Sequence, residues 1–492
     1  MLNELLTLSA TDLAKKIANK EVSPSEVLEI HIQRITDVNT KLNAMVETDF
    51  ERARMRAREQ DDKLMAADSP HDLPVYFGVP FTVKEMFAYD GMKRTGGSVH
   101  HKRDVMNWDA TLVSRLKNSG AIPMGTTNVP ELGFWFETYN RIYGLTKNPY
   151  DLGRTPGGSS GGEGALIGAG ASPMGIGSDI GGSIRMPATF CGIFGHKPSQ
   201  FLLPFTGHFP YSREDIKNIL VGEKYPYTTM GPMSRKASDL YEMMGLMMGP
   251  DGYDQSTLPN VRLKPKPQDW SKVKVVICPD PVFHKARQTD LELIQVVKNC
   301  GKLFEELGAD VVELPQRFFV RSAELWFAAL NKTKNKNFYE VLRGPDQEFS
   351  AMRELFKLVM GRSSYIFPNL IVSLAEMLDT KPKDLEEELR ALQKMRDDLH
   401  QIIGDNGILI LPPHPRVAPK HREPLFSPFD FIYTGIFTTL GMPATSVPMG
   451  LNEEGIPLGV QVVANYLNDH MTLGCAEFLE QTFGGWVPPT NL

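Results

Sequence analysis

The sequence predicts an α/β fold built on one large, largely parallel sheet, and three observations lead to that prediction. A strand pattern at 272–278 is followed by a helical pattern at 290–307 and a second strand pattern at 310–314, an alternation typical of parallel sheets. The 492 residues are 41% hydrophobic and 23% charged, which is enough for a large core. No linker or internal repeat divides the chain, so we expect a single domain over residues 1–492.

Composition argues against several classes of protein. The net charge of −6 provides no basic footprint, so nucleic acid is not an expected partner. The eleven histidines show neither HExxH nor paired-ligand spacing, and we expect no metal and no cofactor. The four cysteines lack CxxC spacing and are typical packing thiols of a reducing compartment, which predicts a cytoplasmic protein.

The first 66 residues predict three helices. Residues 12–18 form a short amphipathic segment, and residues 48–66 a charged, mostly solvated helix. Between them Ser23 suits an N-cap, with Pro24 in the first turn and Glu26 completing a capping box. The N-terminus has no signal-peptide layout, and no apolar run reaches the roughly 18 residues of a membrane span. We therefore expect no integral membrane anchor.

Lys84 follows a short buried strand pattern at 80–83. A single lysine is ordinarily a solvated surface group. Here its neighbours Phe81, Val83 and Phe87 indicate burial. Burial disfavours the ammonium form and lowers the pKa, which would let Lys84 act as a base.

The next segments predict a helix at 110–119, a strand at 121–124 and a turn at 126–130. The turn is followed by three adjacent aromatic residues, Phe134, Trp135 and Phe136. Clustered aromatic side chains are most often part of a core, and they equally suit the lining of an apolar pocket.

Residues 153–199 are the most informative stretch of the chain. Glycines and small hydroxyl residues recur through it. A Gly/Ser linker would carry few apolar residues, whereas here residues such as Ile176, Ile180 and Phe190 lie between the glycines. We therefore expect a buried, tightly packed turn system.

Three pieces of the chain resemble the amidase signature family: Gly78–Glu85 (GVPFTVKE), Gly157–Gly162 (GGSSGG) and Asp179–Arg185 (DIGGSIR). The resemblance covers nearly the whole chain, and the subgroup it is most similar to is the fatty-acid amide hydrolases of the second type. It implies a large twisted, mixed and mostly parallel sheet sandwiched between helices, with a core signature at 78–199. Variable cap or insertion segments are expected at about 204–228 and 330–390.

In that family a lysine, a serine after a cis peptide bond and a second serine form the catalytic triad, which implies Lys84, Ser159 and Ser183 here. Ser183 would attack the substrate, Ser159 would take its proton, and Lys84 would take the proton of Ser159. The resemblance also implies a cis Gly158–Ser159 bond. It further implies an acyl-enzyme and small-molecule amide substrates, with hydrophobic or fatty-acyl amides favoured.

The Gly181–Gly182 pair before Ser183 predicts an oxyanion hole. Without Cβ atoms successive N–H groups can point at one spot. The candidate donors are the N–H groups of Ile180, Gly181, Gly182 and Ser183. One such donor is worth about 3–4 kcal/mol of barrier. Four residues are expected to contact the triad residues and hold them in position: Ser160, Ser178, Asp179 and Arg185. Asp179 and Arg185 would also fit an ordinary ion pair.

Two regions bear on the substrate. Phe134 matches the family's channel phenylalanine, and with Phe136 it is a candidate for the acyl pocket. The apolar segments 355–360 and 365–374 are either a pair of core helices or a surface cap that makes a peripheral membrane contact. On the second interpretation, polar replacements should weaken vesicle association at four positions: Ile366, Phe367, Leu370 and Ile371.

The remaining patterns predict a turn at 231–235 leading into a helix to 248, a long charged helix at 383–403 and a buried strand at 408–411. Sequence alone leaves several alternatives open. Residues 157–161 fit the G-x-S-x-G nucleophile elbow, which needs a preceding strand and a histidine base, with His196 and His414 as candidates. The chain could instead be the amidase subunit of a tRNA-dependent amidotransferase, a general aryl or peptide amidase, or an inactive binding homologue. A homodimer is a further open expectation.

Overall fold

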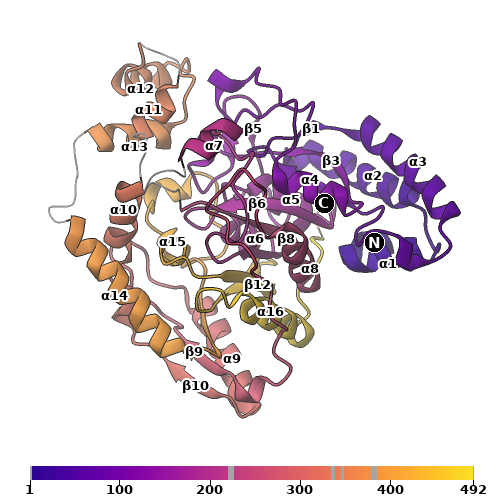
Figure 1. The fold of residues 1–492 in the computed structure, drawn as a ribbon. Coiled ribbons are helices and arrows are strands. Elements are labelled where there is room, and N and C mark those ends of the chain that lie inside the picture. The colour runs from indigo at the N-terminus through magenta and orange to yellow at the C-terminus, as the bar shows by residue number, and fades with distance from the viewer. Residues whose placement is uncertain (1–2, 220–226, 334–337, 345–347, 378–384, 491) are drawn as a thin grey trace.

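Eleven strands from all parts of the chain form one mixed sheet in the computed structural model, which describes residues 3–219, 227–333, 338–344, 348–377, 385–490 and 492 (Figure 1). From edge to edge the strands are β1 (Met45–Thr48), β3 (Ile122–Thr127), β2 (Pro80–Lys84), β6 (Met174–Asp179), β8 (Thr229–Ser234), β7 (Phe194–Lys197), β12 (Ala444–Leu451), β13 (Pro457–Val463), β11 (Gly407–Leu411), β9 (Lys274–Ile277) and β10 (Asp310–Glu313). A separate ribbon pairs β4 (Tyr139–Asn140) with β5 (Gly144–Leu145).

The sheet is mixed: the expected parallel pairing occurs on both sides of an antiparallel centre, and the edge strand β1 is antiparallel to β3. β9 is parallel to β10 and β11, and β2 is parallel to β3 and β6. From β6 through β8, β7, β12 and β13 to β11, every described pairing is antiparallel. The alternation that predicted parallel strands belongs to β9 and β10, whereas β12 and β13 are joined by a short turn, which favours antiparallel pairing.

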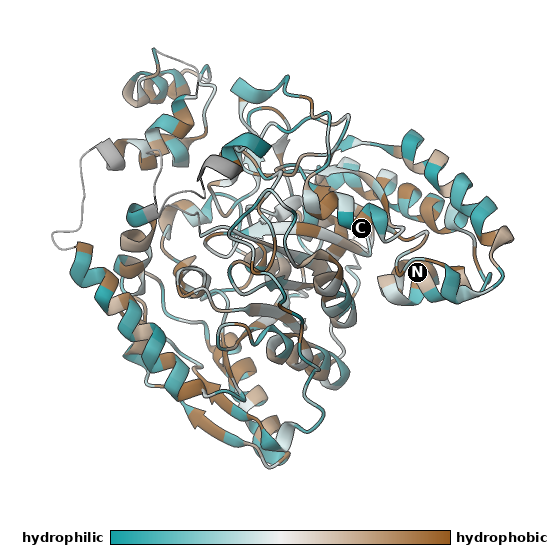
Figure 2. Cartoon of the chain, in the orientation of Figure 1, coloured by the Kyte–Doolittle hydropathy of each residue, from teal (hydrophilic) through white to brown (hydrophobic). Residues whose placement is uncertain are grey.

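Helices cover both faces of the sheet, as the resemblance implied. They are α1 (Ala10–Ala18), α2 (Pro24–Leu42), α3 (Phe50–Ala66), α4 (Thr111–Asn118), α5 (Gly161–Gly168), α6 (Arg185–Phe190), α7 (Arg213–Ile219), α8 (Ala237–Met247), α9 (Leu291–Glu306), α10 (Ser322–Thr333), α11 (Phe338–Arg343), α12 (Ala351–Val359), α13 (Phe367–Met377), α14 (Leu385–Ile403), α15 (Ile432–Thr439) and α16 (Asp469–Phe483). Strand β11 shows the two-sided burial, because alternate residues point to opposite faces. Ile408 and Ile410 join the core that includes α8, α9 and α16, whereas Leu409 and Leu411 join that of α10, α14 and α15. The outer helices α3 and α14 are largely hydrophilic (Figure 2).

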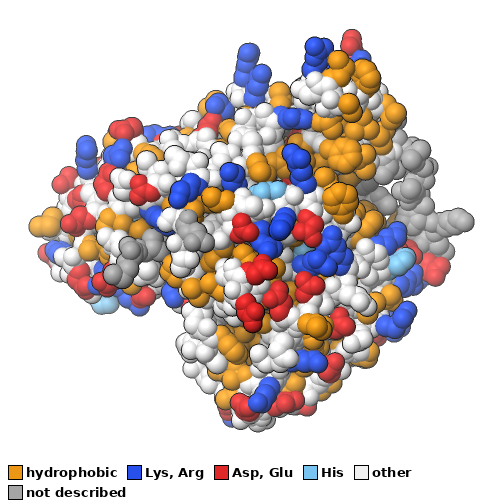
Figure 3. Space-filling view, turned by 180° about the vertical axis from the view of Figure 1, so that it is seen from behind, with side chains coloured by type: hydrophobic (Ala, Val, Ile, Leu, Met, Phe, Trp, Pro, Cys, Tyr) orange, Lys and Arg blue, Asp and Glu red, His pale blue; other side chains and the backbone are white. Residues whose placement is uncertain are grey.

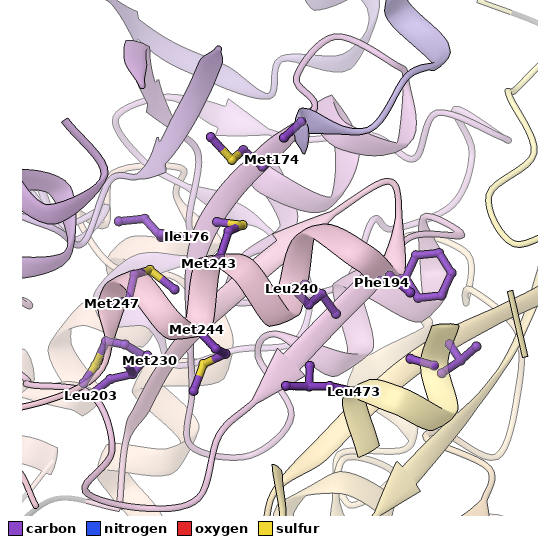
Figure 4. Close-up of a cluster of buried hydrophobic side chains, with 14 of the residues drawn as sticks. Met174, Ile176, Phe194, Leu203, Met230, Leu240, Met243, Met244, Met247 and Leu473 are labelled. Carbon is purple, nitrogen blue, oxygen red and sulfur yellow. The ribbon is translucent and has the colours of Figure 1, made fainter. Parts of the chain in front are cut away.

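Methionine fills much of the core behind β6 and β8 (Figure 4). The buried methionines there are Met174, Met230, Met243, Met244 and Met247. Their flexible thioether chains fill irregular gaps between a helix and a twisted sheet. This packing holds α8 against β8, the antiparallel neighbour of β6, whose carboxyl end carries Asp179.

Local signals set some boundaries, and tertiary packing overrides others. The capping box predicted for α2 is present, with Ser23 Oγ accepting the Glu26 N–H and the Glu26 carboxylate accepting the Ser23 N–H. The stretch 153–199 is mostly buried, as expected, but it forms α5, β6, α6 and β7 rather than turns alone. Residues 231–234, expected as a turn, belong to β8. In both cases burial between neighbouring elements outweighs the weak helix and strand preferences of glycine.

Helices α11, α12 and α13 lie together at one side of the molecule, away from the sheet, and we call residues 338–344 and 348–377 the outer lobe (Figure 1). One side of the lobe is buried around Leu342, Phe349, Tyr365 and Leu370. Six other side chains of the lobe are large, apolar and exposed: Met352, Phe356, Val359, Met360, Phe367 and Ile371. Figure 3 shows hydrophobic side chains gathered on this part of the surface.

The two expected insertions are described in part. Segment 204–228 contains α7, and 330–390 contains the outer lobe, whereas residues 220–226, 334–337, 345–347 and 378–384 lie outside the described residues. The long charged helix expected from residue 383 is described from Leu385 onward as α14. Within the described ranges, no helix has both the length and the apolar composition that crossing a membrane requires.

Candidate active site

Lys84 ends β2 in the interior of the protein, because β2 lies between β3 and β6 in the sheet. Its Nζ lies 2.8 Å from Ser159 Oγ, 2.8 Å from Ser178 Oγ and 3.4 Å from the Ser178 carbonyl oxygen. Burial lowers the pKa of Lys84 to about 7, against the opposing effect of Asp179 and Glu163. The burial expected from its apolar neighbours is confirmed, and a large fraction of Lys84 is the neutral amine at neutral pH.

The backbone ties the segments of Ser159 and Ser183 together. The Gly158–Ser159 peptide is cis, as expected. The Ser160 N–H donates to the Ser183 carbonyl at 3.1 Å, and Ser160 Oγ lies 3.4 Å from the backbone oxygen of Ser178. Among the hydrogen bonds of the described residues, none joins the Ser159 and Ser183 hydroxyls. A proton relay between them would first have to bring the two hydroxyls into hydrogen-bond contact.

Asp179 holds the loop that carries Ser183. Its Oδ1 accepts the Gly182 N–H at 2.7 Å, and its Oδ2 accepts the Ile184 N–H at 3.1 Å. Arg185 donates to the same carboxylate from Nε at 3.0 Å and from Nη2 at 2.9 Å, and both side chains are fully buried. Burial alone would raise the pKa of Asp179, but Arg185 and the N–H donors outweigh burial and lower that pKa. Asp179 and Arg185 are thus an ion pair that also fixes the loop.

Two side chains from distant elements fix the peptide planes of this loop. Trp326 Nε1–H of α10 donates to the Ile180 carbonyl at 3.3 Å, and the Thr434 hydroxyl of α15 donates to the Gly181 carbonyl at 2.8 Å. Because N–H and C=O point in opposite directions across a trans peptide, the Gly181 N–H faces away from Trp326. Gly182 has a φ of +116°, and a Cβ there would lie 2.0 Å from Thr434 Oγ1, so only glycine fits.

The two candidate pocket residues contact different parts of the molecule. The Phe136 ring stacks on Phe431 with centroids 5.2 Å apart, and a Cβ on Gly181 would lie 3.2 Å from the same Phe431 ring. The Phe134 ring lies 4.2 Å from Phe338 of the outer lobe. Both rings are only partly buried, whereas Trp135 between them is buried. We call residues 180–183, which end at Ser183, the serine loop. The aromatic run therefore extends from the serine loop to the outer lobe.

Sequence reasoning missed three buried titratable groups near these residues. Glu163 in α5 accepts hydroxyl hydrogen bonds from Thr82 at 2.6 Å and Thr127 at 2.9 Å, and burial raises its pKa to about 8. His208 Nε2 lies 2.8 Å from Ser178 Oγ. Each is a titratable residue inside a glycine-rich or apolar run, which signals burial but does not reveal the partner.

The third missed group, Glu131, joins the site to the outer lobe. Its carboxylate accepts the Ile366 N–H at 3.1 Å and an Asn369 side-chain N–H at 3.0 Å, and burial raises its pKa to about 7. A Cβ on Gly133, two residues later, would lie 3.5 Å from Ser159 Oγ. The segment 131–133 therefore lies between the lobe and Ser159.

The structure provides neither the preceding strand nor the histidine base that a nucleophile elbow at 157–161 needs. His196 contacts Thr445 and Asp469, and His414 Nδ1 lies 2.8 Å from the Arg416 carbonyl, so both rings are engaged elsewhere. The segment before Gly157 is not a strand. In the part of the chain that the structure describes, no three His, Cys, Asp or Glu side chains are grouped as a metal ion would need.

The family model described as Amidase matches residues 26–473. The chain belongs to the amidase signature family. This amidase is 40% identical over 498 residues to fatty-acid amide hydrolase 2 of Homo sapiens, covering 99% of this chain and 91% of that protein. It is 30% identical over 489 residues to an acylamidase of Rhodococcus erythropolis, covering 96% and 95% of the two chains. The amidase is therefore a hydrolase that acts on amide bonds.

A solved structure supports the fold. The amidase superposes on a bacterial aryl acylamidase of the amidase signature family with a TM-score of 0.78, over 97% of each chain and at 22% identity. That similarity confirms the α/β architecture with its large mixed sheet.

Proposed function

We propose that this amidase is a serine hydrolase in which Ser183 is the nucleophile, Ser159 the bridging residue and Lys84 the base. The observation that carries the proposal is the 2.8 Å contact between Lys84 Nζ and Ser159 Oγ, beside the loop that holds Ser183. A neutral amine is available there because burial lowers the pKa of Lys84 to about 7. The whole chain, with its insertions, would act as one catalytic domain.

In the proposed reaction Lys84 takes the Ser159 proton, Ser159 takes the Ser183 proton, and Ser183 Oγ bonds to the carbonyl carbon of the amide. The proton then returns through Ser159 to the leaving nitrogen, and the C–N bond breaks to give an acyl-enzyme ester. Water attacks the ester and releases a carboxylic acid and free Ser183. Catalytic hydrogen bonds often tighten only when substrate is bound, which fits a relay whose two hydroxyls are not yet joined.

The developing oxyanion would be bound by N–H groups of the loop at 180–183. Those of Ile180, Gly181 and Ser183 are the main donors in this proposal. The Gly182 N–H would contribute less, because it already donates to Asp179 at 2.7 Å. Ser160, Ser178, Asp179 and Arg185 would keep the reacting groups in position.

We propose hydrophobic acyl amides as the substrates, with Phe134 and Phe136 in contact with the acyl group. Support comes from the 40% identity to fatty-acid amide hydrolase 2 and from the aromatic run between the serine loop and the outer lobe. The exposed apolar side chains of the lobe would make the peripheral membrane contact through which such substrates arrive.

The experiment that tests this proposal compares kcat/KM for amides of one amine with acyl chains from acetyl to decanoyl. Each buried CH₂ is worth about 0.8 kcal/mol, so kcat/KM should rise steadily with chain length. A flat or falling series would favour a general aryl or peptide amidase, the activity that the similarity to the acylamidase supports.

Two controls complete the comparison. Glutamine-dependent ammonia transfer and co-purification of a partner would identify the amidotransferase alternative. The homodimer is an expectation from sequence alone, and light scattering of the purified chain tests it by measuring the molar mass in solution.

A further inference from the structure

His208 lies behind the catalytic lysine and has no part in the steps proposed above. Its ring is buried between Phe87 and Phe205, with centroids 5.2 and 5.0 Å away. Its backbone pairs with that of Phe87, three residues after Lys84, and the next N–H, of Phe209, donates to the Met86 carbonyl at 2.7 Å. The ring is therefore held in one orientation beside the end of β2.

The two hydrogen bonds of the ring define its tautomer. Nδ1 lies 2.7 Å from the Phe209 carbonyl, which can only accept, so Nδ1 carries the proton. Burial lowers the pKa of His208 to about 3, so the ring is neutral and Nε2 has no proton. Nε2 lies 2.8 Å from Ser178 Oγ and accepts a hydrogen bond from its hydroxyl group.

This arrangement leaves Lys84 one way to satisfy its neighbours. Because the Ser178 hydroxyl donates to His208, Ser178 Oγ can only accept from Lys84 Nζ, at 2.8 Å. The Ser178 carbonyl, at 3.4 Å, also only accepts. A neutral amine has two N–H groups and one lone pair. With both N–H groups directed to Ser178, the lone pair faces the third neighbour, the Ser159 hydroxyl at 2.8 Å.

We propose that His208 is a positioning residue that sets the direction of proton transfer, because through Ser178 it holds the Lys84 amine with its lone pair towards Ser159. The inference rests on the proposed function, in which Lys84 is the base. When the Ser159 proton moves to Nζ, the resulting ammonium donates to the same three oxygens, so no contact is lost. Without an acceptor at His208, the Ser178 hydroxyl is free to donate to Lys84 and occupy the lone pair itself.

The test compares His208→Asn with His208→Gln in the full chain. Asparagine reaches only the Nδ1 position, where it can donate to the Phe209 carbonyl, whereas glutamine reaches the Nε2 position, where its amide oxygen can accept from Ser178. With a short-chain acyl p-nitroanilide, we expect kcat of His208→Asn to fall about tenfold or more while KM stays within about twofold. His208→Gln should keep kcat within about threefold of wild type.

A double mutant shows whether the effect passes through Ser178. Adding His208→Asn to Ser178→Ala should cause no further loss of kcat, because the hydroxyl that His208 orients is already absent. The matched control is His31→Asn: His31 is also fully buried, with Nδ1 2.8 Å from the Val27 carbonyl, but it lies in α2 and has no link to Lys84. Its kcat should equal that of wild type. If His208→Asn does not fold, as judged by its melting temperature, His208→Leu replaces it, because leucine offers no acceptor.

Three results would overturn the inference and leave the proposed function intact. The first is a wild-type kcat in His208→Asn or His208→Leu, which lack the acceptor. The second is an equal loss of kcat in that variant and in His208→Gln. The third is that His208→Asn lowers kcat by the same factor in the Ser178→Ala background as in the wild type. An inactive wild-type chain would overturn the proposed function itself and this inference with it.

Discussion

Burial acts differently on two neighbouring groups, Lys84 and Asp179, because their partners differ. Asp179 receives Arg185 and backbone N–H groups, so burial does not prevent its ionisation. Lys84 Nζ contacts only hydroxyl and carbonyl oxygens, and burial lowers the pKa of Lys84 to about 7. A charged group that forms an ion pair can be buried, whereas one without a counter-ion tends to become neutral. The charged pair therefore holds the loop, while the lowered pKa of Lys84 supplies the neutral amine that its proposed role as base requires.

The pH dependence of catalysis tests the role of Lys84. Only the neutral amine accepts a proton, so kcat/KM of the wild type should rise with pH through about 7 and then level off. Lys84→Ala should lose about 100-fold or more near pH 7, and its defect should ease at higher pH as hydroxide replaces the amine. Parallel pH profiles for variant and wild type, with Lys84→Ala merely lower, would instead indicate a charged, structural lysine.

Sequence motifs pointed to Lys84, Ser159 and Ser183, and the structure brings all three to one place. Glu163 and His208 could not be found in the same way, because their contacts are made across 81 and 30 residues of the chain. A local pattern reports that such a group is buried, whereas its partner is decided by which strands become neighbours.

At the scale of elements, the serine loop is shaped from outside. Its carbonyl groups are held by Trp326 of α10 and Thr434 of α15, which follow it by 146 and 253 residues in the chain. The loop approaches Thr434 so closely that a side chain at Gly182 has no space. The glycines of the signature are therefore required by close packing at this point, and not by flexibility.

Replacing Gly182 by alanine should remove activity. The new Cβ would lie 2.0 Å from Thr434 Oγ1 at a φ of +116°, so the loop must move and the N–H donors with it. We expect kcat/KM to fall about 100-fold or more, as measured with a short acyl anilide. Gly245→Ala is the matched control: it lies exposed in α8 with no atom within 4 Å of its Cβ, and should stabilise the protein by about 0.5–1 kcal/mol in urea unfolding. Full activity in Gly182→Ala would contradict the account of the loop.

The outer lobe divides the four positions that were expected to contact a membrane. Ile366 and Leu370 are buried in the lobe, whereas Phe367 and Ile371 are exposed. The sequence predicted two apolar segments but not which of their side chains are buried, because that depends on how α13 packs on α11 and α12. More exposed apolar side chains lie on α12 and just after it, with Phe356 at 69% and Val359 at 89% exposure.

Changing Phe356, Val359 and Phe367 to serine should weaken binding to phospholipid vesicles about tenfold or more, as measured by co-sedimentation. Each substitution removes apolar area from the contact with the membrane. Hydrolysis of a short soluble amide should not change. Leu291→Ser is the control, because Leu291 is 82% exposed at the start of α9, outside the lobe. Equal vesicle binding by all variants would show that the lobe does not make the contact. Leu370→Ser should unfold the lobe instead.

At the scale of the molecule, the sheet explains why distant motifs meet. β2 and β6 are parallel neighbours, so their carboxyl ends, which carry Lys84 and Asp179, lie side by side. In α/β sheets this is the end at which ligands bind. Strand–helix alternation predicted the β9 and β10 flank, and the family resemblance implied a mixed sheet. The order of the central antiparallel strands could not be read from the sequence, because it results from long-range pairing of short strands such as β7 and β12.

The most direct measurement of the central claim is to locate the nucleophilic serine by covalent labelling. The wild-type chain is reacted with a fluorophosphonate, digested and analysed by peptide mass spectrometry. We expect one adduct, on Ser183, that is absent from Ser183→Ala, a variant that should fold normally and hydrolyse no amide. An adduct on Ser159, or retained turnover in Ser183→Ala together with loss of turnover in Ser159→Ala, would contradict it.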